Sequence, residues 1–334
     1  MTTKLAINGF GRIGRCVLRA VIEQGRDDIE ILGINDLGPV ETNAHLLKYD
    51  SVHGRLGAEI RAEEDALVVD GRRIRVTAER DPSRLPWEGV DVVLECTGVF
   101  TDAEKARAHL GNGARRVLVS APSSGADRTV VYGVNHDSLR SEDRIVSNAS
   151  CTTNCLAPVA QVIDDAFGIE TGYMTTIHSY TGDQPTLDAL HKDLYRARAA
   201  AMSMIPTSTG AARAVGLVLP HLAGRLDGAA IRVPTPNVSV VDLCVMTRRP
   251  ASPDSVTRAM RMAAEGALAG ILGVEDAPLV SQDFLHDPRS SIYAPGGTRV
   301  TEGGMLRVMA WYDNEWGFSC RMLDTACAMA RLPA

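Results

Sequence analysis

The sequence lacks the marks of a membrane or exported protein. In its 334 residues no uninterrupted apolar run reaches the roughly 20 residues that a membrane-spanning helix needs. A strand-like segment begins by Lys4, which leaves no room for a signal peptide. Internal repeats and low-complexity tracts are also missing, which excludes a repeat array. We therefore expect a globular protein of the cytoplasm.

The sequence also lacks a disulfide framework, a basic field and a metal-ligand cluster. Its seven cysteines are scattered, odd in number and without a CxxC pair, a pattern that favours a reducing compartment. The net charge of -6 comes from mixed signs, so no surface for nucleic acid is implied. Hydrophobic residues make up 45% of a chain long enough for two ordinary domains. We expect no metal and no nucleic-acid or membrane partner.

A glycine-rich stretch near the start predicts a dinucleotide site. Gly9–Gly14 has the spacing GxGxxG, follows a short apolar run and precedes residues at helical spacing. Gly9 permits a tight turn, Gly11 lets the backbone approach a pyrophosphate, and Gly14 lets helix and strand pack closely. Asp36 ends the next strand-like run and can accept hydrogen bonds from the adenosine ribose, so NAD is favoured over NADP. The alternative is a glycine-rich turn in an unrelated α/β domain.

Further β-rich runs extend this half of the chain into an α/β sheet. Residues 90–96 and 116–120 each have the composition of a buried strand. Because ligands bind beyond the carboxyl ends of parallel strands, we expect Thr97 and Ser120 to line the cofactor crevice, unless they are simple turn residues. Two other elements are predicted, a hairpin over 67–76 and a solvated helix over 102–110.

A cysteine stands where the second half of the chain begins. Ser150 is a good N-cap for the helix-compatible run that follows, so Cys151 falls in the first turn. Free N–H groups and the helix dipole favour an anion there, which predicts a lowered thiol pKa and a nucleophilic thiolate. The alternative is a small buried hydrophobe. Cys155, on the same helix, is expected to be a packed residue, with oxidative pairing to Cys151 as the minor alternative.

Two other residues suggest chemistry near this cysteine. His178 ends a strand-like run that follows the Cys151 helix, and within hydrogen-bond reach it would stabilise a thiolate and carry protons. A purely structural histidine is the alternative. Arg232 is a charge inside an otherwise apolar strand. A buried arginine needs a partner, either a substrate phosphate or a structural ion pair.

The remaining segments of this half are a long loop, a helix start and a sheet. Residues 181–204 have no clear period, and so long a loop is expected to cover the cofactor or contact a subunit. Thr209 and Gly210 begin a predicted helix and can bind an anion there. The runs at 237–246 and 307–312 predict antiparallel strands.

Four segments are together specific to one family, and a fifth, Ile7–Gly14, marks where the resemblance begins. The four are Ala149–Cys155, His178–Thr181, Arg232–Asn237 and Trp311–Glu315. With them the chain resembles, essentially end to end, the phosphorylating glyceraldehyde-3-phosphate dehydrogenases. The resemblance implies a Rossmann NAD-binding domain over 1–150, completed by a C-terminal helix over 314–334. It also implies an α+β catalytic domain over 151–313, with a mixed and largely antiparallel sheet, and a homotetramer.

The resemblance also implies a set of site residues. Cys151 matches the nucleophile and His178 its activating base. The matches to NAD contacts are Arg12, Ile13, Asp36, Arg80, Ser120 and Asn314. The matches to the substrate phosphate site are Thr181, Asp183 and Arg232, and those near the attacking inorganic phosphate are Ser150, Thr152, Arg196, Thr209 and Gly210.

The activity implied is the oxidative phosphorylation of D-glyceraldehyde 3-phosphate to 1,3-bisphosphoglycerate with NAD, through a cysteine thioester, in glycolysis or gluconeogenesis. Leu190 stands where NAD-specific members carry proline, which leaves use of NADP open. Two alternatives remain. One is an erythrose-4-phosphate dehydrogenase, which releases an acid by attack of water. The other is a non-catalytic NAD-binding scaffold.

Overall fold

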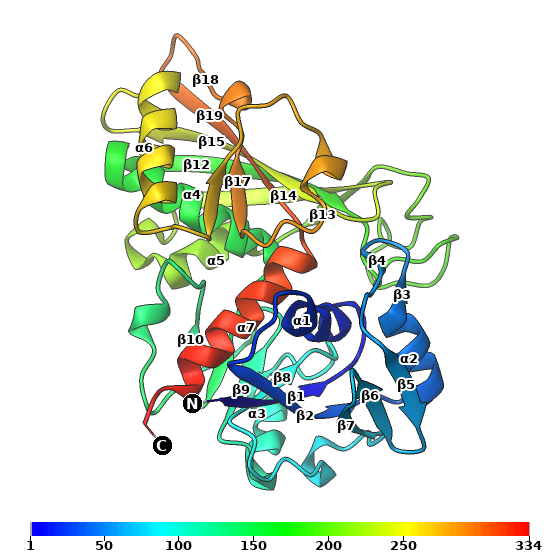
Figure 1. Ribbon diagram of the computed structural model, residues 1–334. Helices are drawn as coiled ribbons and strands as arrows, with labels where there is room; N and C mark the ends of the chain where they lie inside the picture. Colours follow the sequence, from blue (N-terminus) through cyan, green and yellow to red (C-terminus); the bar gives the residue numbers. More distant parts are fainter. Residues whose placement is uncertain (1, 334) are drawn as a thin grey trace. The chain divides into compact units, whose positions relative to one another are not determined.

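The computed structural model describes residues 2–333 and divides them into two compact units (Figure 1). Unit 1 comprises the chain as far as Val130, His136–Ala149 and the residues from Ser319 onward. Unit 2 comprises Val131–Asn135 and Ser150–Phe318. No helix among the described residues is long and apolar enough to cross a bilayer.

A largely parallel sheet forms the centre of unit 1. Its nine strands lie in the order β10-β11-β9-β8-β1-β2-β7-β6-β5. Neighbours from β10 to β7 pair in parallel, and β6 and β5 add an antiparallel edge. The strands are β1 (Thr3–Asn8), β2 (Ile29–Asn35), β5 (Ile60–Glu63), β6 (Ala66–Val69), β7 (Arg72–Thr77), β8 (Val92–Glu95), β9 (Arg116–Val119), β10 (Arg128–Thr129) and β11 (Ile145–Ser147).

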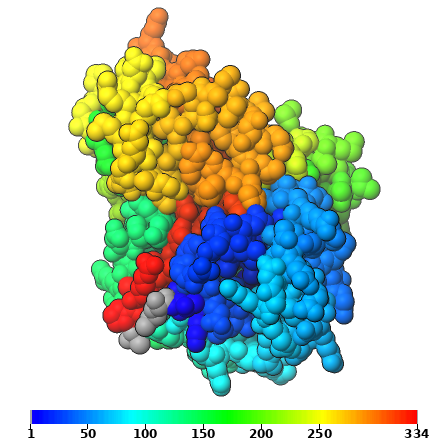
Figure 2. Space-filling view, viewed as in Figure 1, coloured from blue at the N-terminus to red at the C-terminus, as the bar shows by residue number. Residues whose placement is uncertain are grey.

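Helices and short turns complete unit 1. In Figure 2 the dark-blue residues of α1 lie between the red residues of α7 and the lighter-blue segment that contains β5 to β7. The remaining elements are α1 (Arg12–Glu23), α2 (Val40–Lys48), α3 (Ala103–Ala106), most of α7 (Trp316–Ala330), the 3-10 helices η1 (Pro82–Arg84), η2 (Arg107–Asn112) and η3 (His136–Ser138), and the ribbon β3 (Tyr49–Asp50) with β4 (Gly54–Arg55).

The turn between β1 and α1 shows why two glycines of the GxGxxG stretch are required. Gly9 has φ +92°, and a Cβ there would lie 2.6 Å from the backbone nitrogen of Thr97. A Cβ on Gly14 would lie 2.2 Å from the carbonyl oxygen of Gly9. The turn therefore closes tightly only because these side chains are absent. The predicted Rossmann-type fold of this half is confirmed.

Unit 2 is built on a mixed sheet. Seven strands follow the order β13-β14-β12-β15-β19-β17-β16, with β18 paired to β19. The pairs β12–β14 and β16–β17 are parallel and the others are antiparallel, as expected. The strands are β12 (Ile169–Ser179), β13 (Ile205–Ser208), β14 (Leu226–Val233), β15 (Ser239–Thr247), β16 (Leu272–Val274), β17 (Ser291–Tyr293), β18 (Arg299–Val300) and β19 (Met305–Tyr312).

One face of this sheet is packed and the other is open. Met174, Leu243 and Val308 join a buried core with apolar residues of the helices, which Figure 1 shows beside the sheet. Tyr173 and Met246 point to the opposite face and are exposed. The helices are α4 (Cys151–Phe167), α5 (Ala211–Val218) and α6 (Pro253–Glu265), with the 3-10 helices η4 (Pro220–Leu222), η5 (Ser281–Phe284) and η6 (Pro295–Gly297).

Candidate active site and cofactor crevice

Cys151 is the first residue of helix α4. The preceding Ser150 is extended, with φ -106° and ψ 162°, and its hydroxyl accepts a hydrogen bond from the Thr153 backbone nitrogen at 3.1 Å. This is the N-cap that the sequence predicts. It leaves the sulfur at the end of the helix where free N–H groups gather.

The structure brings Cys151 and His178 together. The sulfur lies 3.5 Å from Nε2 of His178, which belongs to β12 and is 3% exposed. Nδ1 of the ring lies 2.8 Å from the carbonyl oxygen of Ser179. Nη1 of Arg232, which can only donate, lies 2.8 Å from the same Nδ1, so this nitrogen faces one acceptor and one donor. In the tautomer with its hydrogen on Nδ1, the ring donates to the carbonyl and turns the Nε2 lone pair toward the thiol. The pair therefore has the geometry of a nucleophile and its base.

The protonation states differ from the expected ones. Burial raises the pKa of the Cys151 thiol above its ordinary value, against the opposing positive charge of Arg232 and the hydrogen bonds of Thr152. Burial, followed by the charge of Arg232, lowers the pKa of His178 to about 3. The prediction of a lowered thiol pKa is therefore wrong for this structure, because desolvation of the sulfur outweighs the helix end. The resting pair is a neutral thiol beside a neutral imidazole.

Arg232 lies on β14 directly opposite His178 of β12. Its Nη1 is 2.8 Å from Nδ1 of His178 and donates to the Ser179 carbonyl at 2.9 Å. Its Nε is buried without a hydrogen-bond partner, and within residues 2–333 no carboxylate forms an ion pair with it. The expected alternative, a structural ion pair, is thus missing. A half-buried guanidinium that has no ion pair and keeps a buried, unbonded Nε favours an anionic ligand.

The loop after β12 gathers three expected residues into one cluster. Asp183 accepts hydrogen bonds from the Thr181 hydroxyl and, at 2.8 Å, from Nη1 of Arg196. Nε of Arg196 donates to the Thr207 hydroxyl at 3.0 Å. The charges of Arg196 and Asp183 act on His178, so the cluster belongs to the same site. Thr207 was not expected, because a threonine in a strand carries no signal of its own.

A second helix begins beside α4. The N-cap of α5 is Gly210, and the Thr209 hydroxyl accepts a hydrogen bond from the Ala211 backbone nitrogen at 3.1 Å. The Thr153 hydroxyl lies 3.4 Å from the Ala211 carbonyl, which places the starts of both helices side by side. Two positive helix ends converge there, a setting that favours an anion.

Tyr312, which was not predicted from the sequence, contacts three residues of the site. Its hydroxyl lies 2.8 Å from the Thr152 hydroxyl and 3.0 Å from that of Thr176. Its ring packs edge-on against His178, with centroids 5.9 Å apart. The Thr152 side chain is therefore turned into the core. A tyrosine at the end of a strand looks like ordinary core in a sequence.

Asn314 is held in one orientation. Its Oδ1 accepts hydrogen bonds from the hydroxyls of Ser179, at 2.9 Å, and Ser239, at 2.7 Å. This leaves Nδ2 as the donor end of the side chain. Asn314 is 5% exposed and belongs to unit 2.

Unit 1 contains a crevice at the carboxyl ends of its strands. It has a volume of about 380 Å³, and its lining includes Gly11, Asp36, Arg80 and Thr97. The two oxygens of Asp36 accept hydrogen bonds from the backbone nitrogens of Phe10, at 2.8 Å, and Gly38, at 2.9 Å. The acid is thus fixed at the rim, as the sequence pattern predicts for contact with a ribose.

The other expected cofactor residues of unit 1 lie near this edge of the sheet. Arg12 is the first residue of α1 and pairs with Asp50, and Ile13 follows it on the same helix. Ser120 directly follows β9 and lies close enough to the thiol of Cys96 to act on its pKa, and Cys96 lines the crevice. Arg12 and Ile13 thus lie at the start of α1, where a phosphate is favoured.

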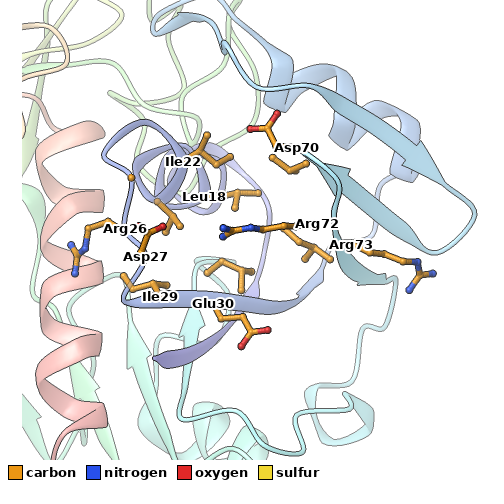
Figure 3. Close-up of a pocket in the computed structure, with 14 residues that line it drawn as sticks. Leu18, Ile22, Arg26, Asp27, Ile29, Glu30, Asp70, Arg72 and Arg73 are labelled. Atoms are coloured by element: carbon orange, nitrogen blue, oxygen red, sulfur yellow. The ribbon is translucent and has the colours of Figure 1, made fainter. Parts of the chain in front are cut away.

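A larger hollow of about 480 Å³ lies elsewhere in unit 1, among α1, β2 and the β6–β7 hairpin. Figure 3 shows Arg72 reaching across it toward Leu18, while Arg73 and Glu30 point away. None of the residues expected to bind NAD lines this hollow. The smaller crevice, which carries the glycine turn and the acid, is therefore the candidate cofactor site.

Known proteins resemble the chain over its whole length. Residues 150–314 match the family described as "Glyceraldehyde 3-phosphate dehydrogenase, C-terminal domain", and residues 3–103 match its "NAD binding domain". The protein named "Glyceraldehyde-3-phosphate dehydrogenase" from Cereibacter sphaeroides is 65% identical over 332 residues, 99% of this chain and 100% of the relative. The chain belongs to the glyceraldehyde 3-phosphate dehydrogenase family.

Other members of this dehydrogenase family are similar in extent. The protein of that name from Xanthobacter flavus is 65% identical over 334 residues, 99% of this chain and 100% of the relative. That from Pseudomonas aeruginosa is 59% identical over 333 residues, 99% of both chains. The family resemblance and the NAD-binding domain expected from the sequence are confirmed.

Proposed function

We propose that this protein oxidises D-glyceraldehyde 3-phosphate with NAD and inorganic phosphate, giving 1,3-bisphosphoglycerate in glycolysis, or the reverse in gluconeogenesis. The observation that carries the proposal is the pair formed by Cys151 and His178, 3.5 Å apart, beside the unpaired cation of Arg232. Family membership supplies the substrate class, and the pair supplies the means for a covalent route.

The route begins at the sulfur. The Cys151 thiol adds to the aldehyde carbon while Nε2 of His178 accepts its proton, so a neutral resting pair suffices. The backbone N–H of Cys151, at the start of α4, stabilises the oxyanion that forms. Bound NAD supplies the oxidising power by accepting a hydride. Oxidation leaves a thioester on Cys151, and attack by phosphate releases the acyl phosphate and restores the thiol.

Two anion sites serve this route. Arg232 and the Thr181 hydroxyl hold the substrate phosphate, while Asp183 orients Thr181 and Arg196 through its hydrogen bonds. The attacking phosphate lies near the starts of α4 and α5, with Ser150, Thr152, Arg196, Thr209 and Gly210 around it. Thr152 serves there through its backbone, since its hydroxyl bonds Tyr312.

Residues of unit 1 fit NAD. The Gly9 turn leaves no room for a Cβ, and at Gly11 no atom lies within 4 Å of where a Cβ would stand, so a pyrophosphate has access to the backbone. We assign NAD contacts to Arg12, Ile13, Asp36, Arg80 and Ser120, and contact with the nicotinamide carboxamide to Nδ2 of Asn314. We assign residues 1–150 with 314–334 to the NAD-binding domain and 151–313 to the catalytic domain. The compact units differ from this assignment in that Val131–Asn135, Ser150 and residues 314–318 fall in unit 2.

The assembly proposed is a cytoplasmic homotetramer. Tyr173 and Met246 expose apolar surface on the open face of the unit 2 sheet, and Leu190 and Leu194 do so on the loop after β12. Such surfaces favour burial against other copies of the chain. None of the seven cysteines, all within the described residues, forms a disulfide, which suits a reducing compartment.

The test is turnover of glyceraldehyde 3-phosphate with NAD, with and without phosphate. We expect reduction of NAD that depends on phosphate, and its loss in Cys151→Ser, which still binds NAD. Phosphate-independent turnover of erythrose 4-phosphate at a higher rate would favour the alternative dehydrogenase. Absence of turnover with either aldehyde would favour the scaffold.

A further inference from the structure

A buried polar chain runs through unit 1 to the wall of the cofactor crevice. Its members are Trp87, His109 and Glu95, which are 2%, 0% and 1% exposed. We infer that Glu95 is a positioning residue that holds both walls of the crevice in the shape that binds NAD, and that His109 and Trp87 fix Glu95 in turn. NAD as the ligand rests on the proposed function. The network itself does not.

Glu95, the last residue of β8, accepts four hydrogen bonds. Oε1 accepts from the backbone nitrogen of Thr97, at 2.9 Å, and from the Thr97 hydroxyl. Oε2 accepts from Nδ2 of Asn8 at 2.6 Å and from Nε2 of His109 at 3.0 Å. A carboxylate offers about four lone-pair positions, and all of them are used here. An amide in its place would present one oxygen to these four donors.

Trp87 determines which nitrogen of His109 faces Glu95. The indole Nε1 can only donate, and it lies 2.9 Å from Nδ1 of His109. Nδ1 is therefore the acceptor, and the ring hydrogen sits on Nε2, directed at Oε2 of Glu95. Nδ2 of Asn8, 3.4 Å from that same Nε2, is also a donor. These two nitrogens therefore share the carboxylate and do not bond each other.

One wall of the crevice is tied to Glu95 through Thr97. The Thr97 hydroxyl donates to Glu95 and accepts from the backbone nitrogen of Val99 at 3.0 Å. This locks the turn around Gly98, whose φ is +71°. Thr97 and Val99 both line the crevice. Without the carboxylate this turn would lose the acceptor that organises it.

The opposite wall is tied to Glu95 through Asn8. Oδ1 of Asn8 accepts from Nδ2 of Asn35 at 2.7 Å. Asn35 in turn bonds the backbone of Glu79 twice, donating to its carbonyl and accepting from its nitrogen, each at 2.9 Å. Asn8, Asn35 and Glu79 line the crevice. One buried carboxylate thus joins the loops after β8 and β7 across the end of β1.

The network should act on affinity and not on the chemical step. Every member belongs to unit 1, whereas Cys151 and His178 belong to unit 2. A crevice whose walls are fixed before binding loses less conformational freedom when the ligand enters. Weakening the network should therefore raise the dissociation constant for NAD and leave turnover at saturating NAD largely intact.

The experiment compares two buried acids changed to their amides in the full-length chain. In Glu95→Gln we expect the Kd for NAD, by titration calorimetry, to rise about tenfold or more, equivalent to about 1.4 kcal/mol. The kcat at saturating NAD should change less than about threefold, so KM for NAD carries the effect. The control is Asp143→Asn, a 3% exposed acid of unit 1 that accepts from Nε of Arg128 and the Arg140 backbone, outside the crevice. Asp143→Asn should lower the stability of the protein and leave its Kd for NAD unchanged.

A coupled pair of changes separates positioning from general destabilisation. Trp87→Phe removes the donor that orients His109, so it should raise the Kd in the natural background and add little in Glu95→Gln. Thr97→Val should raise the Kd for NAD as well. If Glu95→Gln does not fold, the Kd values of Thr97→Val and Trp87→Phe test the inference in its place. Additive effects of the Trp87 and Glu95 changes, or an unchanged Kd in folded Glu95→Gln, would overturn the inference. Failure of the unaltered chain to bind NAD would instead overturn the proposed function.

Discussion

At the scale of single residues, the reactivity of Cys151 is set by what surrounds the sulfur more than by its place on a helix. Burial raises its pKa above the ordinary 9.0. We expect the rate of iodoacetamide labelling in the free protein to keep rising with pH between pH 6 and about 9, since the thiolate fraction grows throughout. Mass spectrometry of the labelled Cys151 peptide measures it. A plateau reached near pH 7 would show a thiolate already formed at rest.

His178 links stability to pH. Its pKa is about 3 in the folded chain against an ordinary 6.5, because burial and Arg232 disfavour its charged form. Below pH 6.5 the unfolded chain therefore binds a proton at His178 that the folded chain does not bind. The contribution of the neutral His178 to the free energy of unfolding is complete above pH 6.5 and declines as the pH falls toward 3. We expect His178→Asn to show a shallower fall in Tm between pH 7 and 5 than the natural protein. Equal falls in Tm for His178→Asn and the natural protein would refute the lowered pKa of His178.

The proposed role of Asp36 in the choice of cofactor can be tested directly. Its carboxylate is fixed at the crevice rim by two backbone N–H groups and would repel a 2′-phosphate. We expect Asp36→Ala to raise the ratio of kcat/KM for NADP to that for NAD by about tenfold or more, mainly through loss of NAD binding. Kinetics with both cofactors measure this. An unchanged ratio would show that another residue discriminates between NAD and NADP.

Single residues also mark what a sequence can and cannot reveal. Cys151 and His178 were predicted, because a cysteine after an N-cap and a histidine at a strand end are local patterns. Glu95 and His109 were not predicted, since neither residue stands out in the sequence by itself. Their proposed role depends on the 3.0 Å contact between them, which only the structure shows. The direction of the Cys151 pKa shift was predicted wrongly, because burial depends on the packed structure around the sulfur.

At the scale of elements, local sequence patterns predicted a hairpin correctly but did not predict contacts between elements. The hairpin of β6 and β7 was predicted, and its turn residues Asp70 and Gly71 both have positive φ, as an Asp-Gly turn requires. The helix expected over 102–110 is instead the short α3 followed by η2. It was also predicted to be solvated, yet it carries the fully buried His109. The partner of His109 lies on another element, which no local pattern indicates.

The turn between β1 and α1 allows folding and binding to be separated. Gly9→Ala places a Cβ 2.6 Å from the Thr97 backbone at φ +92°, so we expect a loss of stability of at least about 1–3 kcal/mol. Gly11→Ala adds a Cβ with no atom within 4 Å, so stability should stay within about 0.5 kcal/mol while NAD affinity falls. Thermal unfolding and NAD titration of both variants measure this. Equal stability losses would contradict the assigned roles.

At the scale of the whole molecule, the proposed tetramer can be tested at two apolar surfaces of unit 2. On the open face of the sheet, Tyr173 is 52% exposed, and Met246 stands opposite Met305 in the β15–β19 register. On the loop after β12, Leu190 and Leu194 are 106% and 82% exposed. A tetramer with dihedral symmetry needs more than one interface, so two such surfaces suit it better than a dimer.

Each surface can therefore be tested by itself. We expect sedimentation equilibrium to show tetramers for the natural chain and dimers for Tyr173→Asp combined with Met246→Asp, because buried charges oppose that contact. Leu190→Asp combined with Leu194→Asp should also give dimers, and all four changes together monomers. Leu217, an exposed leucine on α5, provides the control, since we expect Leu217→Asp to leave the tetramer intact. A natural chain that sediments as a monomer at micromolar concentration would show that neither surface is an interface between copies.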